Sequence, residues 1–235
     1  MKSILFILFV FYPLLNCFCQ TSEEYFKKGN SQFQLQDYNG AIQDYTKAIE
    51  IDSTNDAIYY FRGLSKSSIN DFQGAIEDLN KAVEIKPTAL AFYFRGLLKS
   101  KLLNLTGSII DFTNAIEINP EDADAYFYRG FQKSNLQDYR GAISDCNKVL
   151  EINPADRRVY SIRGLAKLRL EDYNGAIQDC TKAIDYDPKD AKSYYFRGFA
   201  KIALKEKDSS GCLDLSKAGE LGYEDAYDAI KKFCN

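Results

Sequence analysis

Six glycines recur along this chain at a nearly constant step, and this period is the strongest constraint on its fold. The intervals are 34, 33, 34, 34 and 34 residues, between Gly29, Gly63, Gly96, Gly130, Gly164 and Gly198. Four of the five prolines keep the same step, namely Pro87, Pro120, Pro154 and Pro188. A fixed period of this length is typical of stacked repeat proteins, in which a single unit cannot bury its apolar face alone. We therefore expect six stacked units in the 235 residues.

Each unit contains two stretches with helical spacing of apolar residues, separated by a short turn. The turn reads Asp-Tyr-Asn-Gly or a close variant at 37–40, 71–74, 138–141 and 172–175. Proline ends the second stretch because it cannot continue a helical hydrogen-bond ladder. The units are expected at 22–55, 56–88, 89–122, 123–156, 157–190 and 191–222. A capping helix is expected over 223–235, with an apolar face of Ala226, Tyr227, Ile230 and Phe233.

An arginine precedes each glycine from the second unit onward, and an aspartate follows sixteen residues after most of them. The regular pairs are Arg62 with Asp78, Arg95 with Asp111, Arg129 with Asp145 and Arg163 with Asp179. The first unit has Lys28 and Asp44, and the sixth has Arg197 and Asp214 at a separation of seventeen. We expect structural ion pairs between two packed helices, in which removing one partner would strand a buried charge. An anion-binding ladder is the functional alternative.

Composition argues against several classes of function. The chain has no histidine, the commonest general base and the commonest metal ligand. Its net charge of −3 leaves no basic stripe for nucleic acid. It has no phosphate loop, no zinc-ligand spacing and no Ser/His/Asp set. We therefore expect no enzyme activity, no catalytic residue, no metal, no cofactor, no nucleic-acid partner and no small-molecule substrate.

Residues 1–19 differ in kind from the repeats. Lys2 supplies a positive start, the following run is apolar, and Cys17-Phe18-Cys19 has the spacing of a signal-peptidase site. The run is shorter than the ~20 residues that span a bilayer. We expect a signal peptide and an exported protein in the periplasm, at the cell surface or secreted. The alternatives are an uncleaved anchor and a lipoprotein, so membrane attachment is not expected unless Cys17 is lipidated.

Four further cysteines follow the signal segment. Cys146 and Cys180 occupy equivalent sites in successive units, too far apart to bridge, and are expected to be small buried hydrophobes. Cys212 and Cys234 flank the Leu221-Gly222 turn by similar lengths of chain. An antiparallel helix pair would bring these two together, so a disulfide that staples the cap is our hypothesis. A redox-active pair is the weaker alternative, because the chain has no Cys-x-x-Cys motif.

The whole pattern from Ser22 to about Leu221 resembles the tetratricopeptide repeat. Each unit of that family has an aromatic residue at position 4, glycine at 8, alanine at 20 and 27, an aromatic at 24 and proline at 32. The fourth position here is Tyr25, Tyr59, Phe92, Tyr126, Tyr160 or Tyr194. The resemblance implies an all-α fold, an α-solenoid of six helix-turn-helix repeats. It also implies a right-handed superhelix with a concave groove and a capping helix at the C-terminus.

In this family, the groove is lined by positions 2, 5, 9, 12 and 13 of each first helix. The resemblance therefore implies a partner-binding surface made of Phe26, Asn30, Phe33, Tyr60, Leu64, Ser67, Tyr93, Leu97, Ser100, Lys101, Phe127, Phe131, Ser134, Asn135, Leu165, Arg169, Tyr195 and Phe199. The lysine and asparagine clamp that some members use for acidic C-termini is absent, since position 5 is aromatic and only Asn30 matches.

These residues predict a non-catalytic protein–protein interaction scaffold that binds a peptide or protein segment in its groove. One alternative is a structural or assembly subunit of an envelope or secreted complex that uses its convex face and termini. Another is that the groove residues only pack between neighbouring helices.

Overall fold

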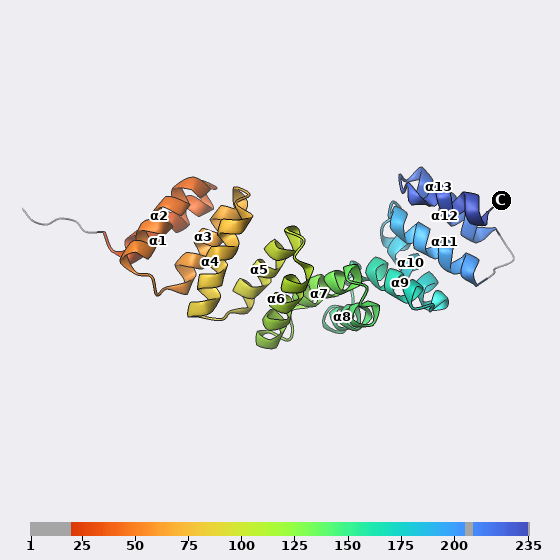
Figure 1. Ribbon diagram of the computed structural model, residues 1–235, viewed down its shortest axis with the longest axis horizontal. Coiled ribbons are helices and arrows are strands. Elements are labelled where there is room, and N and C mark those ends of the chain that lie inside the picture. Colours follow the sequence, from red (N-terminus) through yellow and green to blue (C-terminus); the bar gives the residue numbers. More distant parts are fainter. Residues whose placement is uncertain (1–19, 205–208, 235) are drawn as a thin grey trace, which may run out of the picture. The chain divides into compact units, whose positions relative to one another are not determined.

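The computed structural model describes residues 20–204 and 209–234, and within these ranges all regular structure is helical (Figure 1). The expected signal peptide at 1–19, including Cys17, lies outside the described residues. The chain divides after Pro87 into two compact units. Helices of the first are α1 Ser22–Gln34, α2 Tyr38–Ile51, α3 Asp56–Ser68 and α4 Phe72–Ile85. Those of the second are α5 Ala89–Lys101, α6 Leu105–Ile118, α7 Ala123–Asn135, α8 Tyr139–Ile152, α9 Val159–Arg169, α10 Tyr173–Tyr186, α11 Ala191–Ala203, α12 Ser210–Glu220 and α13 Asp225–Phe233.

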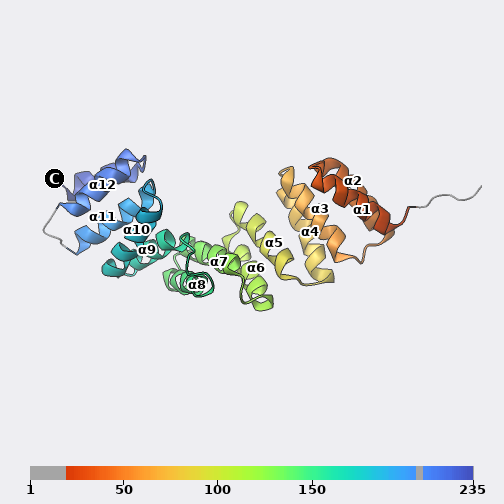
Figure 2. The same cartoon turned by 180° about the vertical axis from the view of Figure 1, so that it is seen from behind.

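The helices form consecutive pairs within each unit. Every odd-numbered helix up to α11 packs against the helix that follows it, and the same order is visible from behind in Figure 2. Within a unit, the second helix of one pair also packs against the first helix of the next. The prediction of an all-α array of helix-turn-helix repeats is therefore confirmed.

The Asp-Tyr-Asn-Gly sequences are helix starts, so their prediction as turns was wrong in detail. Asp71 is the N-cap of α4, and its Oδ1 accepts a hydrogen bond from the Gly74 backbone N–H at 3.0 Å. A Cβ on Gly74 would lie 2.2 Å from Asp71 Oδ2, so a larger residue there would displace the capping carboxylate. The same cap, at the same distance, begins α2, α8 and α10, and Asn104 takes the place of the aspartate at the start of α6. Aspartate and glycine therefore act together as a cap in which the side chain satisfies a backbone donor.

The chain reverses direction just before these caps, through residues in the left-handed region. The φ angles are between 60° and 64° at Gln36, Asn70, Leu103, Gln137 and Glu171. None of these is a glycine, so each turn carries some backbone strain.

The recurring glycines sit where two helices of a pair approach closely. A Cβ on Gly130 would lie 3.0 Å from Asp145 Cβ and 3.4 Å from the Ala142 carbonyl oxygen. The facing position in the second helices is a buried alanine in most repeats, but Ser108 takes this place in α6. Ser108 is also fully buried, and its Oγ has no hydrogen-bond partner among the described residues. Small side chains at this interface therefore set the spacing of each pair.

Helix α9 begins two residues later than the repeat boundary at Arg157 suggests. The equivalent aspartates Asp122 and Asp190 cap α7 and α11. Asp156 instead accepts hydrogen bonds from the Arg158 side chain, with Nη2 to Oδ2 at 2.6 Å. Asp156 Oδ1 also accepts a hydrogen bond from the Arg158 backbone N–H at 3.1 Å, and α9 starts at Val159 without a cap from its own N-cap residue.

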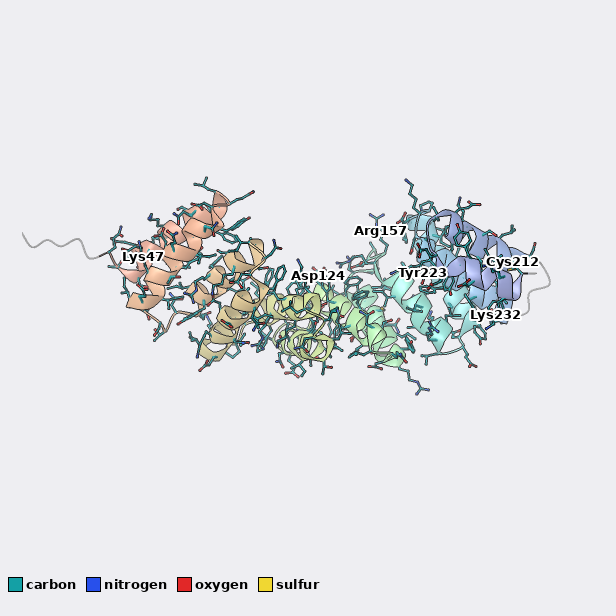
Figure 3. The ribbon with its side chains drawn as sticks, turned by 45° about the horizontal axis from the view of Figure 1, so that its top comes forward. Lys47, Asp124, Arg157, Cys212, Tyr223 and Lys232 are labelled. Carbon is teal, nitrogen blue, oxygen red and sulfur yellow. A yellow bond between two sulfur atoms is a disulfide. The ribbon has the colours of Figure 1, made fainter. Side chains whose placement is uncertain are left out.

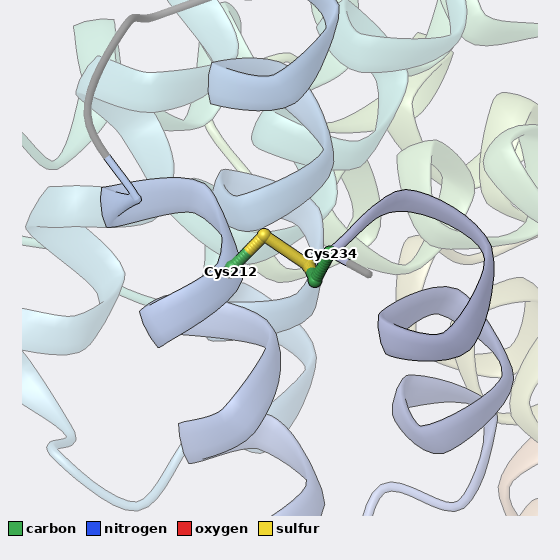
Figure 4. Close-up of a disulfide and its surroundings, with 2 residues drawn as sticks. All are labelled: Cys212 and Cys234. Atoms are coloured by element: carbon green, nitrogen blue, oxygen red, sulfur yellow. A yellow bond between two sulfur atoms is a disulfide. The ribbon is translucent and has the colours of Figure 1, made fainter.

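The C-terminal segment folds back onto the last repeat. Helix α12 ends before Gly222, which has a φ of 93°. The structure joins Cys212 and Cys234 in a disulfide with a Cα–Cα distance of 5.8 Å (Figure 4). The predicted apolar face of α13 was partly wrong. Ala226 and Ala229 are its buried residues, whereas Tyr227 is 55% exposed, and its hydroxyl donates to the Gly219 carbonyl.

Candidate interaction surface

A three-residue charge cluster lies between the two helices of each pair from α3–α4 onward. In the second repeat, Arg62 donates from Nε and Nη2 to Asp78 at 2.9 and 2.6 Å, and Lys66 Nζ lies 2.8 Å from the same carboxylate. The later clusters are Arg95, Lys99 and Asp111; Arg129, Lys133 and Asp145; Arg163, Lys167 and Asp179; and Arg197, Lys201 and Asp214. The sequence reasoning paired the arginines but missed the lysines, whose signal is their spacing of four residues after each arginine.

The arginines also connect neighbouring repeats within a unit. Nη1 of Arg129 donates to Thr113 Oγ1 at 3.2 Å, on the second helix of the preceding pair. Equivalent bonds reach Thr46 from Arg62, Asn147 from Arg163 and Thr181 from Arg197. The arginine side chains are only 12–16% exposed. Because their donors are engaged inside the protein, the structure favours the structural interpretation over an anion-binding ladder.

The first repeat has a weaker cluster. Lys28 stands in the arginine position, is 56% exposed, and donates to Asp44 Oδ1 at 3.2 Å. It lies 3.1 Å from Oδ2 as well, but without hydrogen-bond geometry to that oxygen. Gln32 replaces the lysine of the other repeats, and its Oε1 has no hydrogen-bond partner among the described residues. Among the described residues, Lys28 is therefore the one cation that pairs with the buried Asp44.

The predicted groove residues of the first unit form an aromatic cluster between α1, α2 and α3. The Phe26 ring lies 5.9 Å from that of Tyr45 and 5.8 Å from that of Phe61. Phe33 also packs against Phe61, and Asn30 Oδ1 accepts a hydrogen bond from the Tyr45 hydroxyl at 2.8 Å. The other predicted residues, each partly exposed, are Tyr60, Leu64 and Ser67.

The predicted rings of the second unit also pack partly between helices. The centroid of the Tyr93 ring lies 5.9 Å from the ring centroids of both Phe112 and Tyr128, and the Tyr128 ring stacks on that of Phe112. The sequence reasoning missed the residue that follows each position-5 ring, such as Tyr128 after Phe127. An aromatic pair on the first helix was the available signal.

The remaining predicted residues differ in exposure. Ser134 was wrong as a groove residue, because it is 7% exposed and lies inside the helix packing. Ser100 Oγ accepts a hydrogen bond from buried Gln132, which in turn accepts one from Asn135. Phe131 is 42% exposed. The other predicted members at least partly open to solvent are Leu97, Lys101, Phe127, Leu165, Arg169, Tyr195 and Phe199.

Two cavities open along the last repeats. The first, of about 310 Å³, is walled by Tyr173, Tyr195, Phe196, Phe199 and Leu168 and carries Arg169 and Glu171 at its rim. Tyr223, labelled in Figure 3, lies 4.6 Å from the Tyr195 ring.

The second cavity, of about 320 Å³, lies where α9 begins and α10 ends. Ser161 lines it at the position that is aromatic in the other repeats. Arg157, which is labelled in Figure 3, also lines it. The short serine leaves the space that a ring would fill. Its lining carries both signs of charge, from Arg157 and Arg158 and from Asp187 and Asp190.

Within the described ranges, no group of three or more acidic, cysteine or histidine side chains is arranged to hold a metal ion. The helices of 20–204 and 209–234 include none with the length and apolar character needed to cross a membrane.

Comparisons with known proteins agree with this architecture. A family model described as "TPR repeat" matches residues 29–66, and one described as "Tetratricopeptide repeat" matches 57–88 and 158–190. No curated protein matches the chain. Among solved structures, MamA is 27% identical, with 73% of this chain and 94% of that chain covered and a TM-score of 0.67.

Two further structures show the same fold at lower identity. YrrB, described as a TPR protein with an unusual peptide-binding site, is 24% identical, with 73% of this chain and 89% of YrrB covered and a TM-score of 0.69. A tetratricopeptide repeat protein from Parabacteroides merdae is 21% identical, with coverage of 91% and 99% and a TM-score of 0.65.

Proposed function

Because the chain belongs to the tetratricopeptide repeat family, whose fold serves as a protein–protein interaction scaffold, we propose that its first helices bind a segment of a partner protein. Such repeats are typical of non-catalytic scaffolds. The fold can carry a peptide-binding site, as the description of YrrB states for that protein.

One observation carries this proposal: the first helices of the second unit keep apolar side chains open to solvent while their arginines are used internally. Phe131 on α7 is 42% exposed, and Leu165, Tyr195 and Phe199 are partly exposed on α9 and α11. Arg129 and Arg163 on the same helices are bound to aspartates. The surface offered to a partner is therefore mainly apolar, which suits an extended or helical segment.

A capture experiment tests the site. The chain from Gln20 to Asn235 would be immobilised as wild type and as the Phe131→Glu variant, with partners identified from the host's exported fraction. We expect Phe131→Glu to lose the partner while helicity and the melting temperature stay unchanged. Leu213→Glu is the matched control, because Leu213 is 66% exposed on α12, a second helix.

The control also tests the alternative function, an assembly subunit that uses its convex face and termini. Leu213 and Tyr227, 66% and 55% exposed, are the observation in its favour. Loss of partners in Leu213→Glu with retention in Phe131→Glu would reject the groove and support the assembly function.

Export is part of the same proposal, supported by the composition of residues 1–19. N-terminal sequencing of the protein from its host should begin at Gln20. A chain that retains Met1, or begins at a lipid-modified Cys17, would contradict cleavage after Cys19.

A further inference from the structure

The cavity between the start of α9 and the end of α10 is lined by three residues that break the repeat pattern. Ser161 replaces a ring, since the equivalent residue is Phe or Tyr in each of the other five repeats. Tyr186 ends α10, whereas α2, α4, α6 and α8 all end in isoleucine. Arg157 stands where the other repeats have serine, aspartate or alanine. Because all three departures meet at one cavity, it is a feature of this repeat and not of the repeat architecture.

Most polar groups of this lining are already used inside the protein. Ser193 Oγ is hydrogen-bonded to Ser161 Oγ at 3.1 Å and to Asp190 Oδ2 at 2.6 Å. The Arg158 guanidinium is held in two ion pairs. Arg157 differs, because among the described residues its guanidinium has no ion pair and stands over a ring. The polar groups of the lining therefore do not call for a polar ligand to satisfy them.

The wall of the cavity at the end of α10 is aromatic. The Tyr186 ring stacks on that of Tyr160, with 6.0 Å between centroids, and Tyr186 is 51% exposed. Cζ of Arg157 lies 5.7 Å from the centroid of the Tyr186 ring. An aromatic group that enters the cavity meets both this guanidinium and this ring. Each interacts favourably with a π-system, through a cation–π contact or a ring–ring contact.

Charge and size restrict the occupant further. Asp187 and Asp190 line the cavity together with Arg157 and Arg158, so neither an acidic nor a basic ligand meets a field of one sign. This balance favours a neutral occupant. The volume of about 320 Å³ is at the small end of ligand pockets, which span ~300–1,000 Å³. The cavity therefore suits one large side chain and is too small for a helix.

The cavity is continuous with the surface of the proposed function. Helix α9 packs against α7 and α11, which carry Phe127 and Tyr195 at the repeat position of Ser161. Building on the proposed function, we infer that this cavity takes one aromatic side chain of the bound segment, in the space that Ser161 leaves open. The partner supplies the ring that this repeat lacks, and Arg157 and Tyr186 contact that ring.

The test compares two small probes, N-acetyl-phenylalanine amide and N-acetyl-cyclohexylalanine amide. Their side chains are similar in size, but the cyclohexyl ring has no π-system and is the more apolar of the two. Binding to the chain from Gln20 to Asn235 would be followed through the backbone amide chemical shifts of residues 157–161 and 183–190. We expect dissociation constants in the millimolar range for probes of this size. The aromatic probe should bind about two- to tenfold more tightly than the cyclohexyl probe.

Two variants restore the repeat pattern at the cavity. Ser161→Phe fills the space, so it should abolish binding of both probes and raise the melting temperature. The double variant Arg157→Ala, Tyr186→Ile keeps the space but removes the aromatic contacts, so the preference for the aromatic probe should be lost. Arg140→Ala is the matched control, because Arg140 is an exposed arginine on α8 outside the lining, and it should keep the wild-type preference.

Three results would overturn the inference. They are no shift of these amides at ~20 mM aromatic probe, equal or tighter binding of the cyclohexyl probe by wild type, and an unchanged preference in the double variant. If Ser161→Phe does not fold, the double variant still decides. It introduces the residues with which α7 begins and α8 ends, namely alanine and isoleucine.

The captured partner separates this inference from the proposed function. Loss of the partner in Phe131→Glu with undiminished capture by Ser161→Phe would reject the aromatic anchor and keep the groove. Retention of the partner in Phe131→Glu, with unchanged binding of the aromatic probe at the cavity, would reject the groove but not the ring site.

Discussion

Arg163 and Asp179 are joined by two hydrogen bonds, from Nε to Oδ2 at 2.8 Å and from Nη2 to Oδ1 at 2.7 Å. Nη1 of the same arginine donates to Asn147 Oδ1 at 2.6 Å on the preceding repeat. The hydrogen bond to Asp179 raises the pKa of Arg163, against the effect of burial. One side chain thus connects the two helices of its own repeat and connects that repeat to the one before.

Replacing this arginine should weaken the second unit. Arg163→Met leaves Asp179 buried with Lys167 as its only cation, and we expect a loss of roughly 2–4 kcal/mol in unfolding free energy. Urea unfolding followed by circular dichroism measures the change. Lys167→Met is the control and should cost less, because the arginine and its two hydrogen bonds remain. If Arg163→Met lost no more unfolding free energy than Lys167→Met, the role assigned to the arginine would be contradicted.

Ser108→Ala should stabilise the protein. The buried hydroxyl has no partner among the described residues, so its removal should increase unfolding free energy by about 1 kcal/mol. Ala142→Ser makes the reverse change at the equivalent site of the next repeat and should lower it. Thermal melts of both variants test the pair, and a lower melting temperature for Ser108→Ala would show that the hydroxyl is satisfied.

Leu103→Gly should also stabilise, although it removes an apolar side chain. Leu103 has a φ of 60° and is 82% exposed, so glycine relieves strain at little cost in burial. We expect a gain of about 0.5–1 kcal/mol. Leu102→Gly, where φ is −87°, should destabilise instead. Both unfolding free energies would be measured by urea unfolding. If the two variants changed this free energy in the same direction, the backbone explanation would be contradicted.

The Cys212–Cys234 disulfide should stabilise the last repeat. It closes a loop with a sequence separation of 22, for which chain entropy gives about 3 kcal/mol. The Cys212→Ser, Cys234→Ser double variant should therefore melt earlier. When the mature chain is unfolded and alkylated without reductant, its intact mass should increase by two alkyl groups, because the disulfide protects two of the four cysteines. Four alkylated thiols in the unfolded mature chain would show that the bond is absent.

Stability should fall as the pH rises above 9, partly because of two buried thiols. Burial raises the pKa of Cys146 and of Cys180 from 9.0 to about 12. Between these values, the unfolded chain loses these protons while the folded chain keeps them, so unfolding becomes more favourable as pH rises. Each thiol contributes a slope that approaches ~1.4 kcal/mol per pH unit.

The thiol contribution can be isolated by substitution. Urea midpoints of wild type and of the Cys146→Ala, Cys180→Ala variant would be compared between pH 8 and 10. The variant should show a shallower decline, whatever its stability at pH 8. Parallel declines would assign the effect to other groups.

The repeat period, the helix pairs and the pairing of Arg163 with Asp179 were predictable from the sequence. Each depends on local or regularly repeated spacing, and a step of 34 residues places equivalent side chains in equivalent surroundings. The lysines of the charge clusters were missed because their role depends on the packing of the two helices. Each lysine side chain must extend past a glycine of the facing helix to reach the aspartate. Ser134 was misplaced because a position within a repeat does not by itself determine burial.

The cavity beside Arg169 was decided by tertiary structure alone. Its walls come from residues on α9, α10 and α11, supported by Phe233 near the end of the chain, and no local pattern brings them together. By itself, the sequence determined that this protein is a stack of helix pairs, because periodic apolar and small residues can be buried in no other way. Only the packing of particular side chains decided which rings stay open to a partner and which arginines remain unpaired among the described residues.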